Sequence, residues 1–522
     1  MSTPHPLRTT LRIALSAICA MLLAFLTACG GGAATNSAAA GGAPKSGGTL
    51  RVGIVGGSAK DTLDAHKPVT HPDEARTVQL YDTLATYDTA HKVEMALADA
   101  ITPSPDEKTW TVHLRPGLKF SDGKPITADD VIFTFKRITD PQSPQSGATS
   151  LSTLLRDGLK ATDPQTVAFP FSSPFVTFPD AVAQYAAGIV PVGYDPKKPV
   201  SSGPFVLQDF TPGQQSTFVR NPNYWRAGQP YVDKLVIIDF PDDTARVNAL
   251  LGGQVDAIDQ LPLSQVNIIK ANPNLKVLES QTGDWLPFTM RVDQAPFNNP
   301  KVREAFRLIV DRKQMVDQVL AGHGTIGNDM YAPYDTCYPK DIPQRSQDIA
   351  KAKQMLADAG QSNLSVDLVT SPAAAGFVEA AQVFAQQAKA AGVTVNVKTV
   401  DPGVFYGDQY LKWNFAQDFW FTRDFLSQAA NSGFTASPYN ETHWNDKEWT
   451  DLVNKASATP DQTQRCALIK QAQQIQYDRG GNIIWGFPNS VDAYSSKVSG
   501  FSPDKSGLPL TSFGFRSVWL NK

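Results

Sequence analysis

The clearest pattern of apolar and polar positions lies in residues 97–137. Residues 110–114, Trp-Thr-Val-His-Leu, alternate as a half-buried strand does, and Pro116 ends that strand because proline lacks an N–H. A second turn at residues 121–125, Ser-Asp-Gly-Lys-Pro, precedes Thr127, whose hydroxyl can cap a helix that begins Ala-Asp-Asp. Leu118 to Phe120 restart the alternation between the two turns, so the pattern predicts a strand, a turn, a second strand, another turn and a helix in succession.

More strands and one helix are predicted up to residue 258. Residues 140–199 interrupt this order, because the many prolines there fix φ and remove backbone donors, so that long helices are not expected except around 178–187. The predicted strands cover residues 48–55, 167–169, 202–207, 218–225 and 235–240, a helix covers 243–251, and residues 252–258 turn into a further strand.

In the second half of the chain helices and strands alternate, which indicates an α/β arrangement. Residues 322–327 read Gly-x-Gly-x-x-Gly, but they follow a predicted helix, whereas the dinucleotide motif needs a strand before the loop and a helix after it. We therefore expect a loop there and no nucleotide cofactor. Helices are predicted at 296–322, 348–360, 376–391, 447–456 and 460–479, strands at 366–369, 393–400 and 483–487, and residues 513–520 close the chain.

The first residues predict an exported protein. Two arginines precede an apolar run at residues 13–26, which is shorter than the roughly 20 residues of a permanent membrane helix. The run ends in Leu-Thr-Ala-Cys-Gly, which resembles the lipobox of bacterial lipoproteins, in which the cysteine thiol receives a diacylglyceryl group. That resemblance implies a signal peptide at 1–28 and lipidation of Cys29, and the alternative is an ordinary secretory signal with an incidental cysteine. Residues 29–47, rich in Gly, Ala and Ser, should be a flexible tether.

Composition narrows the class of protein. At 522 residues the chain exceeds the roughly 250–300 residues that one core serves, so two or three domains are expected. A formal charge of -3 argues against a nucleic-acid partner, which usually requires a basic face. Beyond the signal and Cys29 the cysteines are Cys337 and Cys466, and in an oxidising compartment a disulfide between them is favoured over two free thiols.

Several motifs occur in one order along the chain. The longest is W-T-V-H-L-R-P-G-L-K-F-S-D-G-K-P-I-T-A-D-D-V-I-F-T-F at residues 110–135. Five shorter motifs accompany it: Y-D-T-L in a helix expected at 78–88, G-P-F at 203–205, N-P-N-Y-W at 221–225, G-G-Q-V-D-A at 252–257, and P-F-N-N-P-K-V-R-E-A at the start of the helix at 296–322. In the last motif, Asn298 and Asn299 replace the more usual acid. Together they resemble the oligopeptide/dipeptide-binding family, family 5, of the bacterial ABC-transporter extracellular solute-binding lipoproteins.

The resemblance implies a two-lobed, periplasmic-binding-protein-like (type II) α/β fold with an extra subdomain inserted in the first lobe. It also implies that the chain crosses between the lobes near residues 282–291 and 485–488, and that these crossings are the hinge on which the lobes close around a ligand. A disulfide between Cys337 and Cys466 would match one that peptide-binding members carry. Lobe I would comprise residues 46–85, 200–290 and 487–522, the inserted subdomain 86–199 and lobe II 291–486.

The implied function is capture of a peptide or related small molecule between the lobes and its delivery to a membrane ABC permease. The protein would be a monomer, lipid-anchored to the outer face of the bacterial cytoplasmic membrane. The alternative class is a secreted lipoprotein enzyme or adhesin on the same scaffold. The sequence contains no H-E-x-x-H, G-x-S-x-G or Walker motif, so we expect no enzyme and no cofactor. The seven histidines are scattered, so we expect no metal site, although some relatives bind nickel complexes.

The turn at residues 420–424 departs from the family's pattern. Peptide binders have a turn of the type G-W-x-A-D-Y-P-D-P, whose aspartate meets the ligand's ammonium group, whereas this chain has Trp-Phe-Thr-Arg-Asp. One interpretation is that Arg423 and Asp424 pair with neighbours, and the other is that Arg423 binds a carboxylate or phosphate of the ligand. The residues expected to contact the ligand are Trp420, Phe421, Arg423 and Asp424, with Trp285 and Tyr406 as aromatic walls.

Overall fold

The computed structural model describes Met1 and residues 43–521. The predicted signal peptide at 1–28, the lipidation site Cys29 and most of the predicted tether lie outside the described residues, so these stay predictions. Within the described part of the chain, no helix combines the length and the apolar character needed to cross a bilayer.

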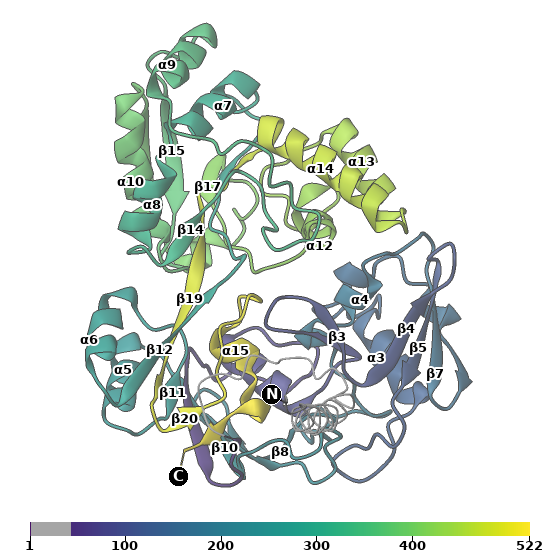
Figure 1. Cartoon of the computed structure of the whole chain (residues 1–522). Helices are drawn as coiled ribbons and strands as arrows, with labels where there is room; N and C mark the ends of the chain where they lie inside the picture. Colours follow the sequence, from purple (N-terminus) through teal and green to yellow (C-terminus); the bar gives the residue numbers. More distant parts are fainter. Residues whose placement is uncertain (2–42, 522) are drawn as a thin grey trace. The chain divides into compact units, whose positions relative to one another are not determined.

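The largest sheet has eight strands that come from distant parts of the chain (Figure 1). Its central strand is β1 (Thr49–Val55), which pairs in parallel with β10 (Lys234–Phe240) on one side and β11 (Ala257–Ile258) on the other. The order continues through the antiparallel strands β9 (Gln215–Arg220) and β8 (Phe205–Thr211) at one edge, and through β19 (Gly486–Ser495) and β12 (Leu275–Gln281) at the other. Alternate residues of β10 are buried, as the apolar run there requires.

Short capped helices cover this sheet. The side chain of Thr70 caps α2 (His71–Leu80) and that of Asp242 caps α5 (Asp243–Leu251), as expected for Thr and Asp at helix starts. The sequence prediction that Y-D-T-L lies in a helix over 78–88 is wrong: α2 ends at Leu80, before that motif. The other elements here are α6 (Val266–Ala271), a short helix at Leu263–Gln265, α15 (Pro509–Phe513), a short helix at Phe515–Ser517, and the strand pair β20 (Val498–Ser499) and β21 (Trp519–Leu520).

A second core surrounds a four-stranded sheet within residues 98–170. The predicted strand and helix are present as β5 (Thr109–Leu114) and α3 (Ala128–Ile138), and Thr127 and Asp130 form a capping box at the helix start. Leu118 to Phe120 do not form the strand that their pattern suggested, since only an isolated bridge joins Lys119 to Pro125. The remaining elements are the hairpin β2 (Ala85–Tyr87) and β3 (Val93–Met95), β4 (Ala98–Pro103), β6 (Lys160–Asp163), β7 (Thr166–Pro170), α4 (Phe178–Ala181) and short helices at Thr149–Leu151, Arg156–Gly158 and Tyr185–Ala187.

The third region holds most of the helices. Its parallel strands β15 (Ser365–Thr370) and β16 (Thr394–Thr399) and the short sheet of β17 (Phe415–Gln417), β13 (Phe288–Met290) and β18 (Asn482–Ile483) pack with helices around one core. The structure joins Cys337 to Cys466 by a disulfide, the pairing that the sequence favoured. The helices are α7 (Pro300–Ile309), α8 (Arg312–Val319), α9 (Ile349–Asp358), α10 (Phe377–Ala390), α11 (Pro402–Phe405), α12 (Phe425–Gln428) continued by a π-helical turn at Ala429–Gly433, α13 (Lys447–Ser457) and α14 (Gln462–Arg479).

Three predictions in this region need correction. The single helix expected at 296–322 is two helices, because Val310 and Asp311 are extended and the Asp311 side chain caps the second helix. The loop expected at 322–327 contains the strand β14 (Gly324–Ile326), which pairs with the start of β19. The strand expected at 483–487 is divided between β18 and β19.

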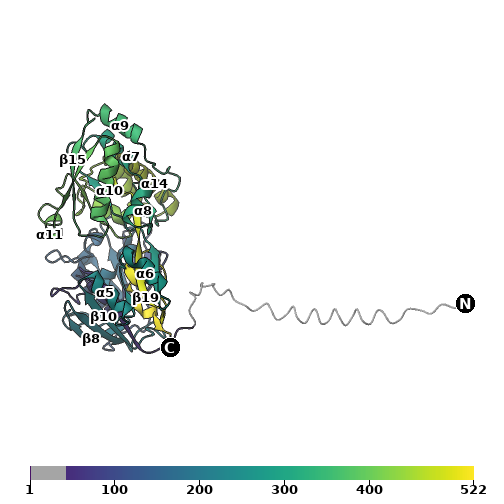
Figure 2. The same ribbon diagram turned by 90° about the vertical axis from the view of Figure 1, so that its left-hand side faces the viewer.

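Strand β19 links the two largest regions (Figures 1 and 2). Its first residues, Gly486 to Pro488, pair with β14 of the third region, and Asn489 to Ser495 pair with β12 of the large sheet. The Thr282 hydroxyl donates a hydrogen bond to the carbonyl of Pro488 (2.7 Å). Two stretches of the chain therefore lie side by side where it passes between these regions.

Candidate functional site

Two predicted aromatic residues lie directly against one another. Trp285 and Trp420 exchange two backbone hydrogen bonds of 3.0 Å each, and their rings stack with centroids 5.9 Å apart. The ring of Tyr331 stacks on the other side of Trp285, and the Trp420 indole donates to Glu441 (2.8 Å). Both tryptophans are buried, at 1% and 7% exposed, so they form a packed support behind the turn at 420–424.

Asp284 holds that turn in place. One of its carboxyl oxygens accepts hydrogen bonds from the backbone N–H (2.7 Å) and the hydroxyl (3.0 Å) of Thr422. The hydroxyl of Thr422 in turn accepts from the N–H of Gly283 (2.8 Å). Burial raises the pKa of Asp284 to about 7, although the bonds from Thr422 and the charge of Arg423 act in the opposite direction.

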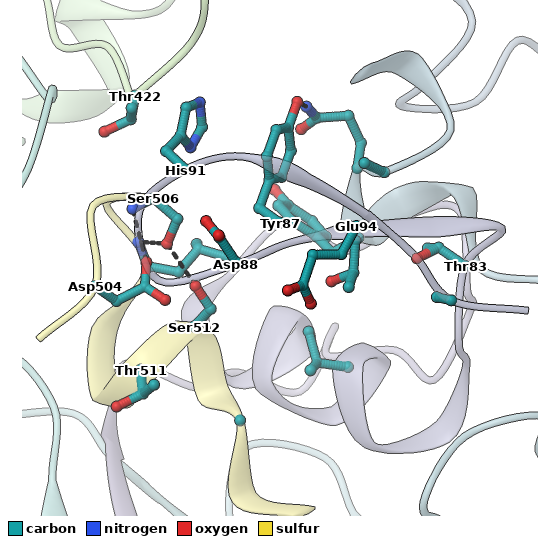
Figure 3. A pocket seen from close by; sticks show the side chains of 18 of the residues that line it. Thr83, Tyr87, Asp88, His91, Glu94, Thr422, Asp504, Ser506, Thr511 and Ser512 are labelled. Carbon is teal, nitrogen blue, oxygen red and sulfur yellow. Dashed lines mark hydrogen bonds between the residues drawn. The ribbon is translucent and has the colours of Figure 1, made fainter. Parts of the chain in front are cut away.

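A cavity of about 550 Å³ lies beside the turn (Figure 3). Such a volume is in the range of small-molecule sites. In the described part of the chain its walls come from four distant segments: residues 78–96 with the hairpin of β2 and β3, residues 183–186, the segment from Phe421 to Asn431, and residues 500–517. Additional lining residues are Ser146, Gly147, Ser150 and Arg226.

Of the predicted site residues, Phe421 and Arg423 line this cavity. Trp285 and Trp420 are not among its lining residues. Tyr406 follows α11 and donates from its hydroxyl to Asp418 (3.1 Å), with its ring against Tyr410. Whether Trp285, Trp420, Tyr406 and Asp424 also meet a ligand stays a prediction.

The guanidinium of Arg423 lies over the ring of Trp420, 5.5 Å from its centroid. Burial lowers the pKa of Arg423, while Tyr185 and Asp284 raise it. Among the described residues Arg423 takes part in no ion pair and no hydrogen bond of its side chain. A cation that is partly withdrawn from water and has no counter-charge is suited to meet an anion that enters the cavity.

Asp424 turns to a different set of neighbours. Burial raises the pKa of Asp424 well above its ordinary value, and the nearby carboxyls of Asp335 and Asp180 raise it further. Burial also raises the pKa of Asp180 to about 6, and the Tyr87 hydroxyl donates to Asp180 (3.2 Å). Asp424 therefore belongs to a cluster of partly buried carboxyls and forms no ion pair with Arg423.

Sequence reasoning missed the cavity walls at residues 82–94 and 500–517. No motif of known chemistry marks the first, and the second adopts an unusual backbone that no pattern revealed. Residues 510–513 all have φ between 51° and 59°, although none is glycine. Each left-handed residue of this kind costs about 1–2 kcal/mol. Thr511 stabilises the turn by donating to the carbonyl of Ser502 (2.7 Å), and Thr511 and Ser512 line the cavity.

The metal prediction can be examined only in part. Within the described residues, no three side chains of His, Cys, Asp or Glu come together in a way that could hold a metal ion.

Comparison with known proteins gives consistent matches over most of the chain. The family model of the bacterial extracellular solute-binding proteins, family 5, matches residues 92–446. The heme-binding protein A of Haemophilus influenzae is 27% identical over 486 residues, which cover 85% of this chain and 87% of that protein. The glutathione-binding protein GsiB of Escherichia coli K12 is 26% identical and covers 89% of this chain and 93% of its own.

Solved structures agree with this match. The periplasmic binding protein AgaA of A. tumefaciens R10, in complex with agropinic acid, has a TM-score of 0.78 at 24% identity and covers 91% of this chain and 99% of its own. The protein DppA of Helicobacter pylori, in complex with the peptide STSA, has a TM-score of 0.78 at 23% identity and covers 92% of this chain and 99% of its own. These similarities show the fold.

The buried Asp284 carboxyl predicts a pH-dependent stability. Its folded pKa of about 7 exceeds its ordinary value of 3.8, so the folded state binds more protons between these values and loses stability as the pH rises through 7. Asp284→Asn removes this titration and keeps an acceptor for Thr422. The variant should gain about 2–4 kcal/mol relative to the native chain between about pH 4 and pH 8.

Urea unfolding at these two pH values measures the difference. The control is Asp157→Asn, because the Asp157 side chain is 89% exposed. Its replacement should change the free energy of unfolding by the same amount at both pH values. An equal stability difference for Asp284→Asn at both pH values would contradict the prediction.

Proposed function

The chain belongs to family 5 of the bacterial extracellular solute-binding proteins, and we propose that its solute is a peptide or peptide-like small molecule whose carboxylate is bound by Arg423. Members of this family bind solutes and are not enzymes, and the chain serves an ABC importer by delivering its solute to the permease. This excludes the alternative of a secreted enzyme on the same scaffold.

One observation carries the proposal: the guanidinium of Arg423 borders the cavity, is partly buried, and has no ion-pair partner in the described part of the chain. Arginine presents several N–H donors in a plane that matches a carboxylate. Stacking over Trp420 holds the guanidinium in position without neutralising it. An entering carboxylate would supply the missing charge.

The ligands of similar proteins fit this chemistry. Agropinic acid, the peptide STSA and the dipeptide Met-Leu each occupy a solved structure of the same fold, and glutathione is the solute of another relative. All four compounds carry a carboxylate. They support the class of solute proposed here and do not choose among its members.

A panel of these four compounds tests the proposal. Thermal unfolding of the purified protein should shift upward with at least one of them, because a ligand that binds only the folded state stabilises it. The C-terminal amides of Met-Leu and STSA, which lack the carboxylate, are the matched probes and should give smaller shifts. Equal shifts with peptide and amide would argue against a carboxylate site.

Arg423→Ala should weaken binding of the best panel compound by roughly 1.5–3 kcal/mol, the scale of a charged hydrogen bond, which is at least about tenfold in affinity. Calorimetry measures the two dissociation constants. The control is Arg51→Ala, whose guanidinium lies on β1 outside the cavity and is half exposed. If Arg423→Ala binds as tightly as Arg51→Ala, Arg423 has a structural role and the solute is held elsewhere.

The division into lobes is part of the same proposal. The lobes are lobe I (46–85, 200–290 and 487–522), with the inserted subdomain 86–199, and lobe II (291–486). The support is that Thr282, directly after β12, lies beside Pro488 of β19 where the chain passes between the two largest regions. We expect these crossings to act as a hinge in a monomeric protein.

Small-angle scattering tests hinge and monomer together. The forward intensity should give the mass of one chain, and the radius of gyration should fall when the best panel compound is added. A dimeric mass would overturn the monomer, and an unchanged radius would overturn the closure.

Attachment to the membrane is proposed through lipid on Cys29. The support is the sequence Leu-Thr-Ala-Cys-Gly after an apolar run, together with an extracellular family. Cys29→Ala should move the protein from the membrane fraction to the soluble exported fraction, because two acyl chains anchor stably and their loss leaves no anchor. Mass spectrometry of the native protein should find a diacylated residue 29 at the N-terminus. An unmodified N-terminus at another residue would contradict the anchor.

A further inference from the structure

The loop between β2 and β3 presents His91 at the cavity wall (Figure 3). The ring of His91 stacks on that of Tyr87, with centroids 4.4 Å apart and an interplanar angle of 4°. One carboxyl oxygen of Asp88 accepts from the N–H groups of Ala90 (2.9 Å) and Lys92 (2.8 Å), and the N–H of His91 donates to the carbonyl of Asp88 (3.0 Å). These contacts fix the loop before any ligand arrives.

Both ring nitrogens of His91 are buried and have no hydrogen-bond partner in the described part of the chain, although the residue is only 7% exposed. Buried polar groups are nearly always paired, and an unpaired one costs about 1–3 kcal/mol. His66 provides the contrast within this chain. Its ring is fully buried, with Arg137 donating to one nitrogen (2.6 Å) and the other donating to the carbonyl of Gly188 (2.8 Å). Among the described residues, the structure thus satisfies the buried ring of His66 and leaves both ring nitrogens of His91, in the cavity wall, without a partner.

The imidazole of His91 is neutral near pH 7. Burial lowers the pKa of His91 to about 4, and the charge of Lys505 lowers it further, while Asp88 acts in the opposite direction. A neutral imidazole has one nitrogen that donates and one that accepts. It can therefore accept a hydrogen bond from an N–H group in the cavity.

The carboxylates of Asp88 and Asp504 line the same cavity as His91. The N–H of Lys505 donates to the carbonyl of Thr89 (3.1 Å), which joins the two segments. Burial raises the pKa of Asp504, and the negative charge of Asp88 raises it further. The two carboxyl groups therefore interact electrostatically. The N–H of Ser506 donates to Asp504 (2.7 Å) and orients it.

The other charged side chains that line the cavity are likewise without ion-pair partners among the described residues. Four carboxylates and three guanidiniums line it, and none of the seven takes part in an ion pair among the described residues. The neighbouring ammonium of Lys505 is engaged over the ring of Tyr334, 4.5 Å from its centroid. The carboxylates are Asp82, Asp88, Glu94 and Asp504, and the guanidiniums belong to Arg226, Arg423 and Arg516.

We infer that Asp88, His91 and Asp504 form a second subsite, which takes an ammonium group of the solute whose carboxylate meets Arg423. The inference rests on the proposed function for the identity of the solute. An ammonium group has three donors, one for the open nitrogen of His91 and the others for the two carboxylates. The solute is then a zwitterion that is bound with its positive end at residues 88–91 and 504 and its negative end at the 420–424 turn.

The test uses an enzymatic casein digest as probe, in its native form and after acetylation of its amino groups. Immobilised protein is incubated with each form, and retained peptides are released by denaturation and identified by mass spectrometry. We expect retention from the native digest and at least tenfold less from the acetylated one, since acetylation removes the ammonium and its charge-assisted bonds. The most abundant retained peptide and its acetylated form then give dissociation constants by calorimetry.

Variants assign the effect to the subsite. His91→Phe keeps the ring that stacks on Tyr87 and removes both nitrogens, and it should weaken binding of the native peptide at least tenfold. His91→Asn should recover part of this loss, because asparagine tolerates the positive φ of 63° at this position and offers a donor and an acceptor. The control is His113→Phe on β5, outside the cavity and with a side chain 44% exposed. Thermal unfolding without peptide checks that each variant is folded.

The outcomes separate this inference from the proposed function. Equal retention of native and acetylated peptides, or native affinity in His91→Phe, would mean that His91 holds only water, and the subsite would be overturned while the carboxylate site stands. Retention that is lost in Arg423→Ala but kept in His91→Phe would likewise overturn the subsite alone. If the native chain retains nothing from either digest, the peptide class of solute fails and the subsite fails with it.

Discussion

The backbone pairing of Trp285 with Trp420 is the contact on which the geometry of the site depends. It ties the stretch that follows β12 to the turn that follows β17, and these lie about 135 residues apart in the sequence. The two hydrogen bonds fix the register, so Thr422 lies opposite Gly283, and the neighbouring Asp284 carboxyl accepts hydrogen bonds from both donors of Thr422. Once Thr422 is held, its neighbours Phe421 and Arg423 reach the cavity, and Asp424 turns toward Asp180 and Asp335. If the pairing of the two stretches shifted by one residue, the side chains that now face the cavity would point away from it, and those that now point away would face it.

Desolvation governs the electrostatics of this site more than charge pairing does. For Asp284, Asp424 and Asp180 burial is the largest influence on the pKa, and for each it favours the neutral acid. Neutral carboxyls can be packed beside one another, as in the cluster around Asp424, where charged ones would repel. The same burial works against the positive form of Arg423, whose cationic state is nevertheless retained because its ordinary pKa is so high. The site therefore keeps a partly buried cation, and the acids near it form no ion pair with it among the described residues.

Local signals of the sequence predicted local structure well. Thr127 before Ala-Asp-Asp gave the start of α3, and the apolar runs gave β1 and β10, because caps and alternation are decided within a few residues. The break at Asp311 was missed because the apolar spacing continues through it, although an aspartate can start a helix anywhere. The strand β14 was missed because its partner, β19, lies some 160 residues later. For the candidate site, the cavity-lining residues Phe421 and Arg423 could be named from the departure of one turn from its family pattern. His91 and residues 510–513 could not, since only the folded chain brings them to the same cavity.

Fold similarity leaves the choice of solute open, and the charges that line the cavity restrict it. Proteins with a TM-score of 0.78 to this chain hold ligands as different as agropinic acid and a peptide. A binding site discriminates between solutes largely through unfavourable interactions. A ligand that leaves a desolvated charge or a buried imidazole unpaired binds more weakly, because no hydrogen bond or counter-charge offsets the desolvation of that group. In the proposed site, Arg423 would impose such a penalty on a solute without an anion, and His91 would impose one on a solute without a matching polar group. Because both groups are held rigidly before binding, by Trp420 and by Tyr87, little of the binding free energy is lost in ordering them. We therefore propose that the selectivity of this protein resides in two groups, unpaired in the described part of the chain, that are oriented by aromatic rings.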